Sequence, residues 1–419
     1  MITLCVLYFA QGFPWGFMTT ALISFLASKG LTMVQSGQLT AMAYLPWTFK
    51  LFWGPLIDSF TILKMGKRRP WILFAQLGMI ITLIMMAWMG DISENIILLG
   101  WMFFFHNCFA SLQDVSCDAL AVDILLPKEQ GKVNGAMWGS KVVGTGLGAG
   151  VMGTVLVIKG LEFAIFLQTL VMIVIVMFPL IILERPNESR FPWSKGEKIT
   201  KIKKNRLINP IKVFKTLVLA FSKKASFFGG VFILTAAINQ GLNSGILPVY
   251  YNKNFGWESD FYSQIVGGPA MMLEFLAALL GGFLADKYGR RRIFFLGWGG
   301  FSIAAGVLGF MISTYENVPY WFQMGFLVIS PSLIAIGTVS MFALAMALSW
   351  SSASATMFTS YMAISNLSVV IGTNLIGPLT AVFNMGELYI FMMLIGLLPA
   401  FLLKKIDPKQ ILILKEKNS

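Results

Sequence analysis

Five ionisable side chains interrupt long apolar stretches of this sequence: Lys50, Asp114, Asp118, Lys141 and Glu274. If those stretches cross a bilayer, a charge inside one is costly unless it faces a cavity or a partner of opposite charge. Each of the five is therefore a candidate for binding a charged substrate, carrying a proton or pairing within the protein. Ion pairing that only orders the helices is the alternative for the whole set.

The spacing of these charges predicts which of them meet. Asp114 and Asp118 are four residues apart and share one helix face. Asp114 lies thirteen residues before Pro127, and Lys141 lies thirteen residues after Lys128. Each is therefore about 20 Å from the loop that joins their helices. We predict an ion pair between Asp114 and Lys141.

A coupling proton needs a group that changes charge near the working pH, which a solvated carboxyl with a pKa of about 4 does not do. A buried carboxyl beside a second carboxylate binds a proton more readily. If Lys141 keeps Asp114 ionised, the proton goes to Asp118. Glu274, alone on its helix, is the rival. The alternative for Asp118 is a cap at the inner gate.

The apolar stretches that hold these residues dominate the chain of 419 residues, of which 57% are hydrophobic and 12% charged. A span needs roughly 20 apolar residues, so the chain has room for about a dozen helices. We predict an all-α membrane protein with twelve spans, near residues 3–27, 36–58, 70–89, 96–124, 132–158, 162–183, 226–250, 261–285, 293–313, 320–349, 354–383 and 386–403.

The basic residues predict the orientation. The stretch from Glu184 to Lys224 holds twelve Lys/Arg against three Glu, and part of it, 208–221, has the pattern of a surface helix. Alternate loops and the tail hold 27 of the 32 Lys/Arg. This bias puts both termini and the central loop in the cytoplasm. The opposite loops are short and acidic, with Asp91 and Glu94 among their residues. The net charge of +13 is therefore a topology signal, and we expect no nucleic-acid partner.

The two halves of the sequence repeat. Gln11-Gly12 in the first span returns as Gln240-Gly241 in the seventh, and a motif of Gly, Asp and basic residues recurs at an offset of 228 residues. Parallel halves of six helices are a transporter architecture, with the substrate site between them near the midplane. The predicted division is 1–183 and 226–403 for the halves, 184–225 for a linker and 404–419 for a cytoplasmic tail.

Lys50 and Glu274 stand on matching helices of these halves, eight residues before Asp58 and twelve before Asp286 respectively. We expect them to form a pair across the cavity or to contact substrate separately.

The repeated motif resembles the signature loop of the major facilitator superfamily. In both copies a helix that ends in Gly and Asp leads into a Gly-plus-basic turn, and the first turn contains Gly66 and Lys67. The resemblance implies the major facilitator fold and a gating role for the motif residues, which are Gly54, Asp58, Arg68, Arg69, Gly282, Asp286, Gly289, Arg290 and Arg291.

Polar side chains concentrate on a few spans. The superfamily places the first helix of each triplet along the cavity, and spans one, four and seven are the polar ones here. We predict substrate contacts from Gln11, Asn107, Gln113, Asn239, Gln240 and Asn243, with Lys50 and Lys141 meeting carboxylates and Trp15 or Trp138 stacking on a sugar. His106 is interpreted as a helix-packing residue. The glycines of span five, from Gly144 to Gly153, indicate close helix packing.

Four stretches resemble the muropeptide permeases and the related acetyl-CoA transporters more specifically: Tyr8 to Pro14, Leu45 to Asp58, Gly66 to Trp71 and Leu112 to Asp123. The resemblance covers most of residues 8–150 and implies a permease of the bacterial inner membrane. Its substrate would be a peptidoglycan fragment, a disaccharide of N-acetylglucosamine and anhydro-N-acetylmuramic acid with a stem peptide, imported with protons.

Other functions are weighed against this one. An acetyl-CoA or other phosphate-bearing anion would need more cavity cations than two lysines. A non-transporting sensor of the same fold is a second alternative. An enzyme is not expected, because the chain has one His and no nucleophile–base or Cys/His cluster. Cys5, Cys108 and Cys117 indicate neither disulfides nor a metal site. We expect no cofactor, no secretory signal before the first span, and a monomer.

Overall fold

The computed structural model describes residues 1–60, 62, 64–89, 95–185, 187–194, 221–349 and 354–403. Within these residues the regular structure is helical throughout. Asp91, Glu94, most of the proposed surface helix at 208–221 and the tail at 404–419 lie outside the described residues.

The N-terminal half consists of six helical rods. The first is continuous from α1 through a π-helical segment, η1, to α2, and the second bends where α3 gives way to α4. The bounds are α1 Ile2–Gly16, η1 Phe17–Leu22, α2 Ile23–Ser28, α3 Met33–Thr48, α4 Lys50–Ser59, α5 Arg69–Ala87, α6 Ile96–Ile124, α7 Pro127–Lys159 and α8 Leu161–Ile181.

The C-terminal half repeats this plan, with bends and π-helical segments in four of its rods. The bounds are α10 Lys224–Ala236, α11 Ile238–Lys253, α12 Ser259–Ile265, η3 Val266–Ala270, α13 Met271–Tyr288, α14 Arg290–Phe294, η4 Phe295–Gly299, α15 Gly300–Thr314, α16 Tyr320–Leu348, α17 Ser354–Thr380, α18 Met385–Leu397 and α19 Pro399–Leu403.

The twelve predicted spans are confirmed in the described part of the chain. Ten of the helical stretches there are long and apolar enough to cross a membrane. The rods Ile2–Ser28 and Met33–Ser59 match the two remaining predictions. The division at 183/184 and 225/226 stays a prediction.

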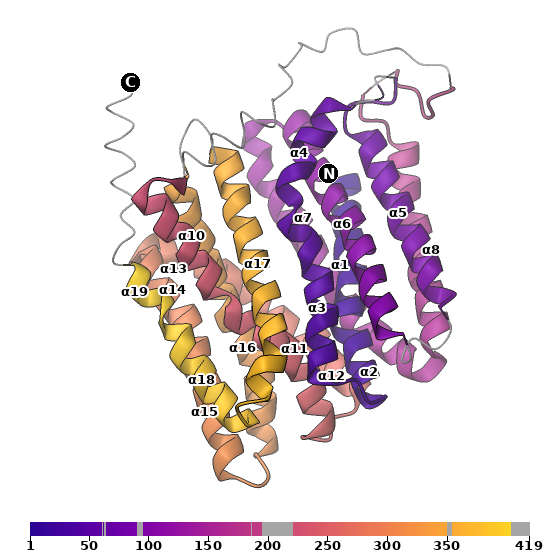
Figure 1. Ribbon diagram of the computed structural model, residues 1–419. Helices are drawn as coiled ribbons and strands as arrows, with labels where there is room; N and C mark the ends of the chain where they lie inside the picture. Colours follow the sequence, from indigo (N-terminus) through magenta and orange to yellow (C-terminus); the bar gives the residue numbers. More distant parts are fainter. Residues whose placement is uncertain are drawn as a thin grey trace.

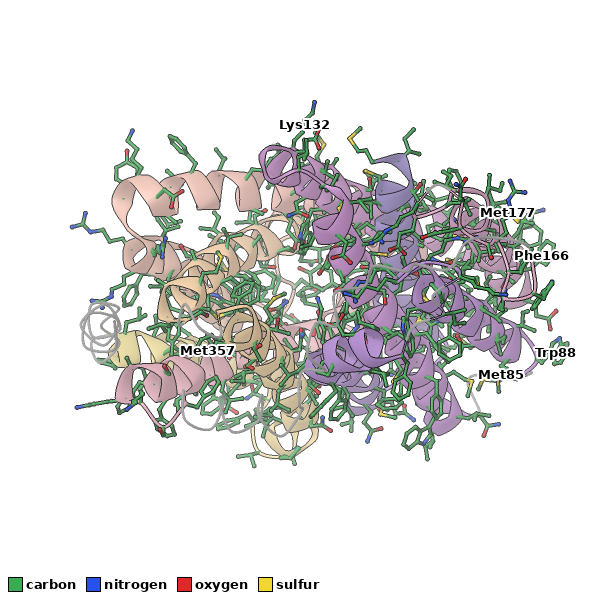
Figure 2. All side chains as sticks on the ribbon, turned by 90° about the horizontal axis from the view of Figure 1, so that it is seen from above. Met85, Trp88, Lys132, Phe166, Met177 and Met357 are labelled. Carbon is green, nitrogen blue, oxygen red and sulfur yellow. The ribbon has the colours of Figure 1, made fainter. Side chains whose placement is uncertain are left out.

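Each half has its own hydrophobic core. One cluster of buried residues runs from Leu4 to Ile175 and the other from Ala225 to Leu403. The halves lie side by side, the first in indigo to magenta and the second in red to yellow (Figure 1). Seen from above, Trp88 and Phe166 point outward at the margin (Figure 2). Trp88 follows the last residue of α5, which is the third rod, and Phe166 lies on α8, which is the sixth. Their exposure fits a position facing lipid for these two rods.

The halves close on each other at one end, which carries the loops 29–32 and 254–258 and lies at the bottom of Figure 1. Ser24 donates to the carbonyl of Ser259 at 3.2 Å, and Lys253 Nζ to that of Gly30 at 3.2 Å. A Cβ on Gly146 of α7 would lie 2.6 Å from the carbonyl oxygen of Gly267 in η3. Only glycine permits this approach, so the close packing predicted for the glycines of the fifth span is confirmed at Gly146.

Candidate functional site

The first copy of the glycine–aspartate–basic motif forms an ion-pair network where α4 ends. Arg68 Nη1 lies 2.6 Å from Asp58 Oδ1, and Arg68 Nε donates to Asp123 Oδ2 of α6 at 2.9 Å. Lys67 Nζ lies 3.4 Å from the same Asp58 oxygen. Gly66 turns the chain at a φ of +98°, a conformation that favours glycine. The loop therefore ties α4 to α6.

Arg69 anchors the chain that follows α8. Its buried guanidinium donates to four backbone carbonyls between Pro179 and Arg190, at 2.5–3.2 Å. The carboxylate of Glu184 accepts from the backbone N–H groups of Arg68 and Arg69 at 2.8 and 3.2 Å. The loop thus holds the start of the central linker.

Glu188 lies beside Glu184 under the same turn, and a Cβ on Gly66 would meet a carboxylate oxygen of each. Burial and the neighbouring negative charge of Glu184 raise the pKa of Glu188 above its ordinary value of 4.5. This carboxyl is therefore easier to protonate than a solvated one.

The second copy of the motif is arranged differently. Asp286 is exposed and makes no ion pair with any residue that the structure describes, whereas Arg290 Nη1 donates to the carbonyl of Ala343 at 2.8 Å. Gly289 makes the turn at a φ of +96°, and Arg291 is exposed. The motif glycines Gly54 and Gly282 are not crowded by described residues, since a Cβ on Gly54 would meet nothing within 4 Å and the nearest atom to one on Gly282 is 3.7 Å away.

The intramembrane charges gather around Lys50, the first residue of α4. Its ammonium forms an ion pair with Asp114 and lies 3.9 Å from Asp118 Oδ2. Tyr8 of α1 donates its hydroxyl hydrogen to the other oxygen of Asp118. The side chains of Lys50 and Asp114 are 14% and 5% exposed, whereas that of Asp118 is 46% exposed. One cation thus serves two carboxylates, of which only Asp118 is open to solvent.

The predicted ion pair between Asp114 and Lys141 is wrong. Lys50 occupies that place because α3 ends at Thr48 and the chain bends at Phe49 before α4 begins. Depth along a helix, on which the prediction was based, does not say which neighbour a side chain faces. The alternative pair between Lys50 and Glu274 is not formed either.

Lys141 lies over two indole rings instead. Its Nζ is 4.8 Å from the ring centroid of Trp47 and 5.4 Å from that of Trp138, distances at which a cation is attracted to a ring face. Trp138 is 56% exposed. No carboxylate oxygen in the described residues lies within 4.0 Å of this ammonium, and the charges of Asp114 and Asp118 act on it from farther away.

An aromatic cluster adjoins Lys141, and the sequence analysis predicted its member Trp15 but missed Tyr44 and Trp47. The ring of Trp15 packs edge-on against Tyr44, with centroids 4.8 Å apart, and against Trp47, with centroids 5.9 Å apart. Both Tyr8 and Trp47 lie in stretches that carry the family resemblance, which is the signal that could have identified them.

Glu274 belongs to the rod of the C-terminal half that touches α7 at Gly146 and Gly267. It is partly buried on α13, and its carboxylate has no hydrogen bond or ion pair among the described residues. Its negative charge acts on the hydroxyl of Tyr44, which belongs to α3 in the other half. Glu274 is therefore an unpaired anion at the boundary between the halves.

The polar residues predicted in the N-terminal half differ in their contacts. Gln11 is buried, and neither amide atom has a partner among the described residues. Asn107 accepts from Trp47 Nε1 at 3.2 Å. Gln113 donates to the carbonyl of Leu7 at 2.7 Å, which ties α6 to α1. Asn107 therefore borders the aromatic groups and Gln113 joins helices, while Gln11 has no hydrogen-bond partner among the described residues.

Two of the polar residues predicted in the C-terminal half lie in its interior. Asn239 donates to the carbonyl of Met392 at 2.6 Å, and Asn243 accepts from the hydroxyl of Tyr389 at 3.5 Å. Gln240 is partly buried. His106 lies 2.9 Å from Thr82 Oγ1, as expected for a helix-packing residue.

Comparisons with known proteins agree with this architecture. A family model described as Major Facilitator Superfamily matches residues 4–239 and 230–418. Three solved structures superpose over 97% of the chain: a D-xylose–proton symporter (TM-score 0.71, 14% identity, 98% of that chain), a transporter of the POT family in complex with a thioalcohol-conjugated peptide (0.70, 13%, 96%) and the nucleoside transporter NupG (0.67, 15%, 99%). At these identities the likeness shows the fold.

Curated relatives match over shorter stretches. The anhydromuropeptide permease of Escherichia coli K12 is 29% identical over 134 residues, which is 30% of this chain and 26% of that protein. An uncharacterized protein of Haemophilus influenzae is 27% identical over 132 residues, covering 30% of this chain and 29% of that protein. The putative transporter AmpG 3 of Rickettsia prowazekii is 30% identical over 96 residues, 22% of either chain. The matched region therefore spans less than a third of these relatives.

Proposed function

The chain belongs to the major facilitator superfamily and is a multi-pass membrane transporter of small molecules, and we propose that it imports an amphipathic organic anion together with protons. The substrate that we propose is an anhydro-muropeptide derived from peptidoglycan. The observation that carries the proposal is the ammonium of Lys141, which has no direct ion pair and lies over the rings of Trp47 and Trp138 beside the ion cluster of Lys50.

This arrangement fits the parts of such a substrate. A carboxylate of the stem peptide would pair with Lys141, and a sugar face would stack on the exposed ring of Trp138. The unsatisfied amide of Gln11 would bond sugar hydroxyls or peptide groups, since a buried amide without a partner is costly. Likeness to an anhydromuropeptide permease over 134 residues supports the same substrate.

The proton is assigned to Asp118. Lys50 contacts Asp114 directly and lies 3.9 Å from Asp118, and the charge of Lys141 acts on both carboxylates from farther away. The ionised form of Asp118 is therefore the less strongly held of the two, because the attraction between charges falls with distance. Asp114 stays ionised against Lys50, while Asp118, 46% exposed, is the carboxylate that water reaches.

Several further assignments belong to this proposal. The protein lies in the bacterial inner membrane as a monomer, with both termini and the central linker in the cytoplasm, and it acts as a carrier rather than an enzyme. Residues 1–183 and 226–403 are its two halves. In that orientation the end closed by Gly146 and Gly267 faces outward.

Transport by purified protein in liposomes tests this function. A radiolabelled anhydro-muropeptide should accumulate when an inward proton gradient is imposed and should exchange by counterflow without one. Asp118→Asn should abolish accumulation and keep counterflow, with Glu274→Gln made in parallel as the rival. If Asp118→Asn retains full gradient-driven accumulation, the assignment to Asp118 is wrong, and loss of accumulation in Glu274→Gln would then assign the proton to Glu274. Uptake of acetyl-CoA but not of the muropeptide would favour an acetyl-CoA carrier. Uptake of neither anion would favour a non-transporting sensor.

A further inference from the structure

Two opposite charges, Lys141 and Glu274, form no direct ion pair in the described part of the chain, and the carboxylates of Asp114 and Asp118 act on Lys141 only from beyond 4.0 Å. Their helices touch at Gly146 and Gly267, on the closed side of the molecule. Lys141 precedes Gly146 by five residues on α7, and Glu274 follows Gly267 by seven residues on the antiparallel η3–α13 rod. At 1.5 Å per residue they lie about 8 Å and about 10 Å from that contact, on the same side of it. The cation and the anion therefore stand at matching depth on opposite halves.

Aromatic rings connect the two charges. Lys141 lies over Trp47, the ring of Trp15 touches both Trp47 and Tyr44, and Glu274 acts on the hydroxyl of Tyr44. Tyr44 and Trp47 are three residues apart on α3, so they share one face of that helix. The chain thus presents a wall of three rings with a positive group at one end and a negative group at the other.

We propose that this wall is a binding subsite for an ampholyte, a ligand that carries both a carboxylate and an ammonium group. The carboxylate pairs with Lys141, the ammonium pairs with Glu274, and the intervening part of the ligand packs on Trp15, Tyr44 and Trp47. The inference rests on the proposed function and narrows it to muropeptides whose stem peptide keeps a free side-chain amine.

The physical reason is the cost of each charge left alone. An unpaired charge in a low-dielectric interior is unfavourable, and a ligand of complementary charges removes both penalties at once. Because Lys141 and Glu274 belong to different halves, one ligand joins the halves, whereas a ligand without the amine engages Lys141 only. This gives Glu274 a role in selecting substrate that is distinct from carrying the proton.

Two probes separate these roles. The first is an anhydro-muropeptide with a stem tripeptide that ends in a diamino acid bearing a free amine, and the second is the same compound with that amine acetylated. Counterflow of both is measured in one preparation of liposomes, so that the ratio of the two does not depend on the amount of folded protein. The unchanged protein should prefer the free amine by about tenfold to a hundredfold, the range of one charged hydrogen bond.

Glu274→Gln should reduce that ratio to about one, and Glu274→Asp, which keeps the charge, should retain a preference. Lys141→Gln should weaken transport of both probes, since both have the carboxylate. A methyl ester of the first probe should be transported by the unchanged protein about as weakly as the first probe is by Lys141→Gln. These results together would establish the ampholyte subsite.

Four outcomes would overturn it. If the preference for the probe with the free amine persists in Glu274→Gln, a group other than Glu274 binds the ammonium. If Glu274→Gln loses accumulation of both probes while keeping their counterflow and their ratio, Glu274 carries the proton instead. Equal transport of both probes by the unchanged protein refutes the subsite and leaves the muropeptide function standing, whereas transport of neither refutes that function and the subsite with it.

Discussion

Removing either partner of the Lys50–Asp114 pair should destabilise the protein, because each change leaves a charge buried alone. The two side chains are only 14% and 5% exposed, so solvent screens the uncompensated charge weakly. For a buried pair the cost of breaking it from one side is about 3–5 kcal/mol, which is roughly two to four powers of ten in the folding equilibrium.

The structure also predicts an order between the two changes. In Asp114→Asn, Lys50 still has Asp118, whose carboxylate oxygen is 3.9 Å away. In Lys50→Met, Asp114 and Asp118 keep only the more distant charge of Lys141, and the repulsion between the two carboxylates adds to the loss of the pair. Lys50→Met should therefore cost more than Asp114→Asn.

The double variant Lys50→Met/Asp114→Asn should recover a large part of the loss, since replacing both members of a buried pair is often neutral. Unfolding in mixed micelles with increasing SDS gives the free energies for a double-mutant cycle. The matched control is the cycle of Asp114→Asn with Lys141→Met, in which the coupling should be smaller. A larger coupling to Lys141 than to Lys50, or additive losses at Lys50 and Asp114, would refute the assignment of the pair.

Three more predictions follow from the same structure. A cysteine in place of exposed Trp193 should react with a membrane-impermeant maleimide only from the cytoplasmic side, and a cysteine in place of Glu316 should react only from outside. Labelling of either cysteine from the opposite side would overturn the orientation. Gly146→Trp should hold the halves apart where a Cβ at position 146 meets Gly267, and should therefore increase the labelling of cysteines placed at the outer end. Gly139→Ala on the same helix, where a Cβ meets nothing within 4 Å, should leave that labelling unchanged. The raised pKa of Glu188 means that the folded state binds the Glu188 proton more tightly than the unfolded state does, so the contribution of Glu188 to stability decreases as the pH rises above 4.5 and is fully lost above the folded pKa. The variant Glu188→Gln should therefore have a higher melting temperature than the unchanged protein at pH 7.5 and the same melting temperature at pH 4. An equal difference in melting temperature at both pH values would contradict this pH dependence.

The sequence by itself determined the elements. Apolar runs of spanning length predicted each rod, because a helix in lipid must satisfy its backbone internally and present apolar side chains outward. The repeated Gly, Asp and basic residues predicted two equivalent halves, and the first copy folds into the ion network of Asp58, Arg68 and Asp123. The exposed Asp286 shows that an equal motif does not ensure equal contacts.

Only the tertiary structure decided which charges meet. Residue spacing fixes the height of Asp114 and Lys141 along their helices, but not the direction in which each side chain points or which helix lies beside it. The bend at Phe49 turns Lys50 toward α6, and the rings of Trp47 and Trp138 receive Lys141 in its place. The facing of Glu274 and Tyr44 depends in the same way on how the two halves pack, which is long-range information that helix periodicity does not contain.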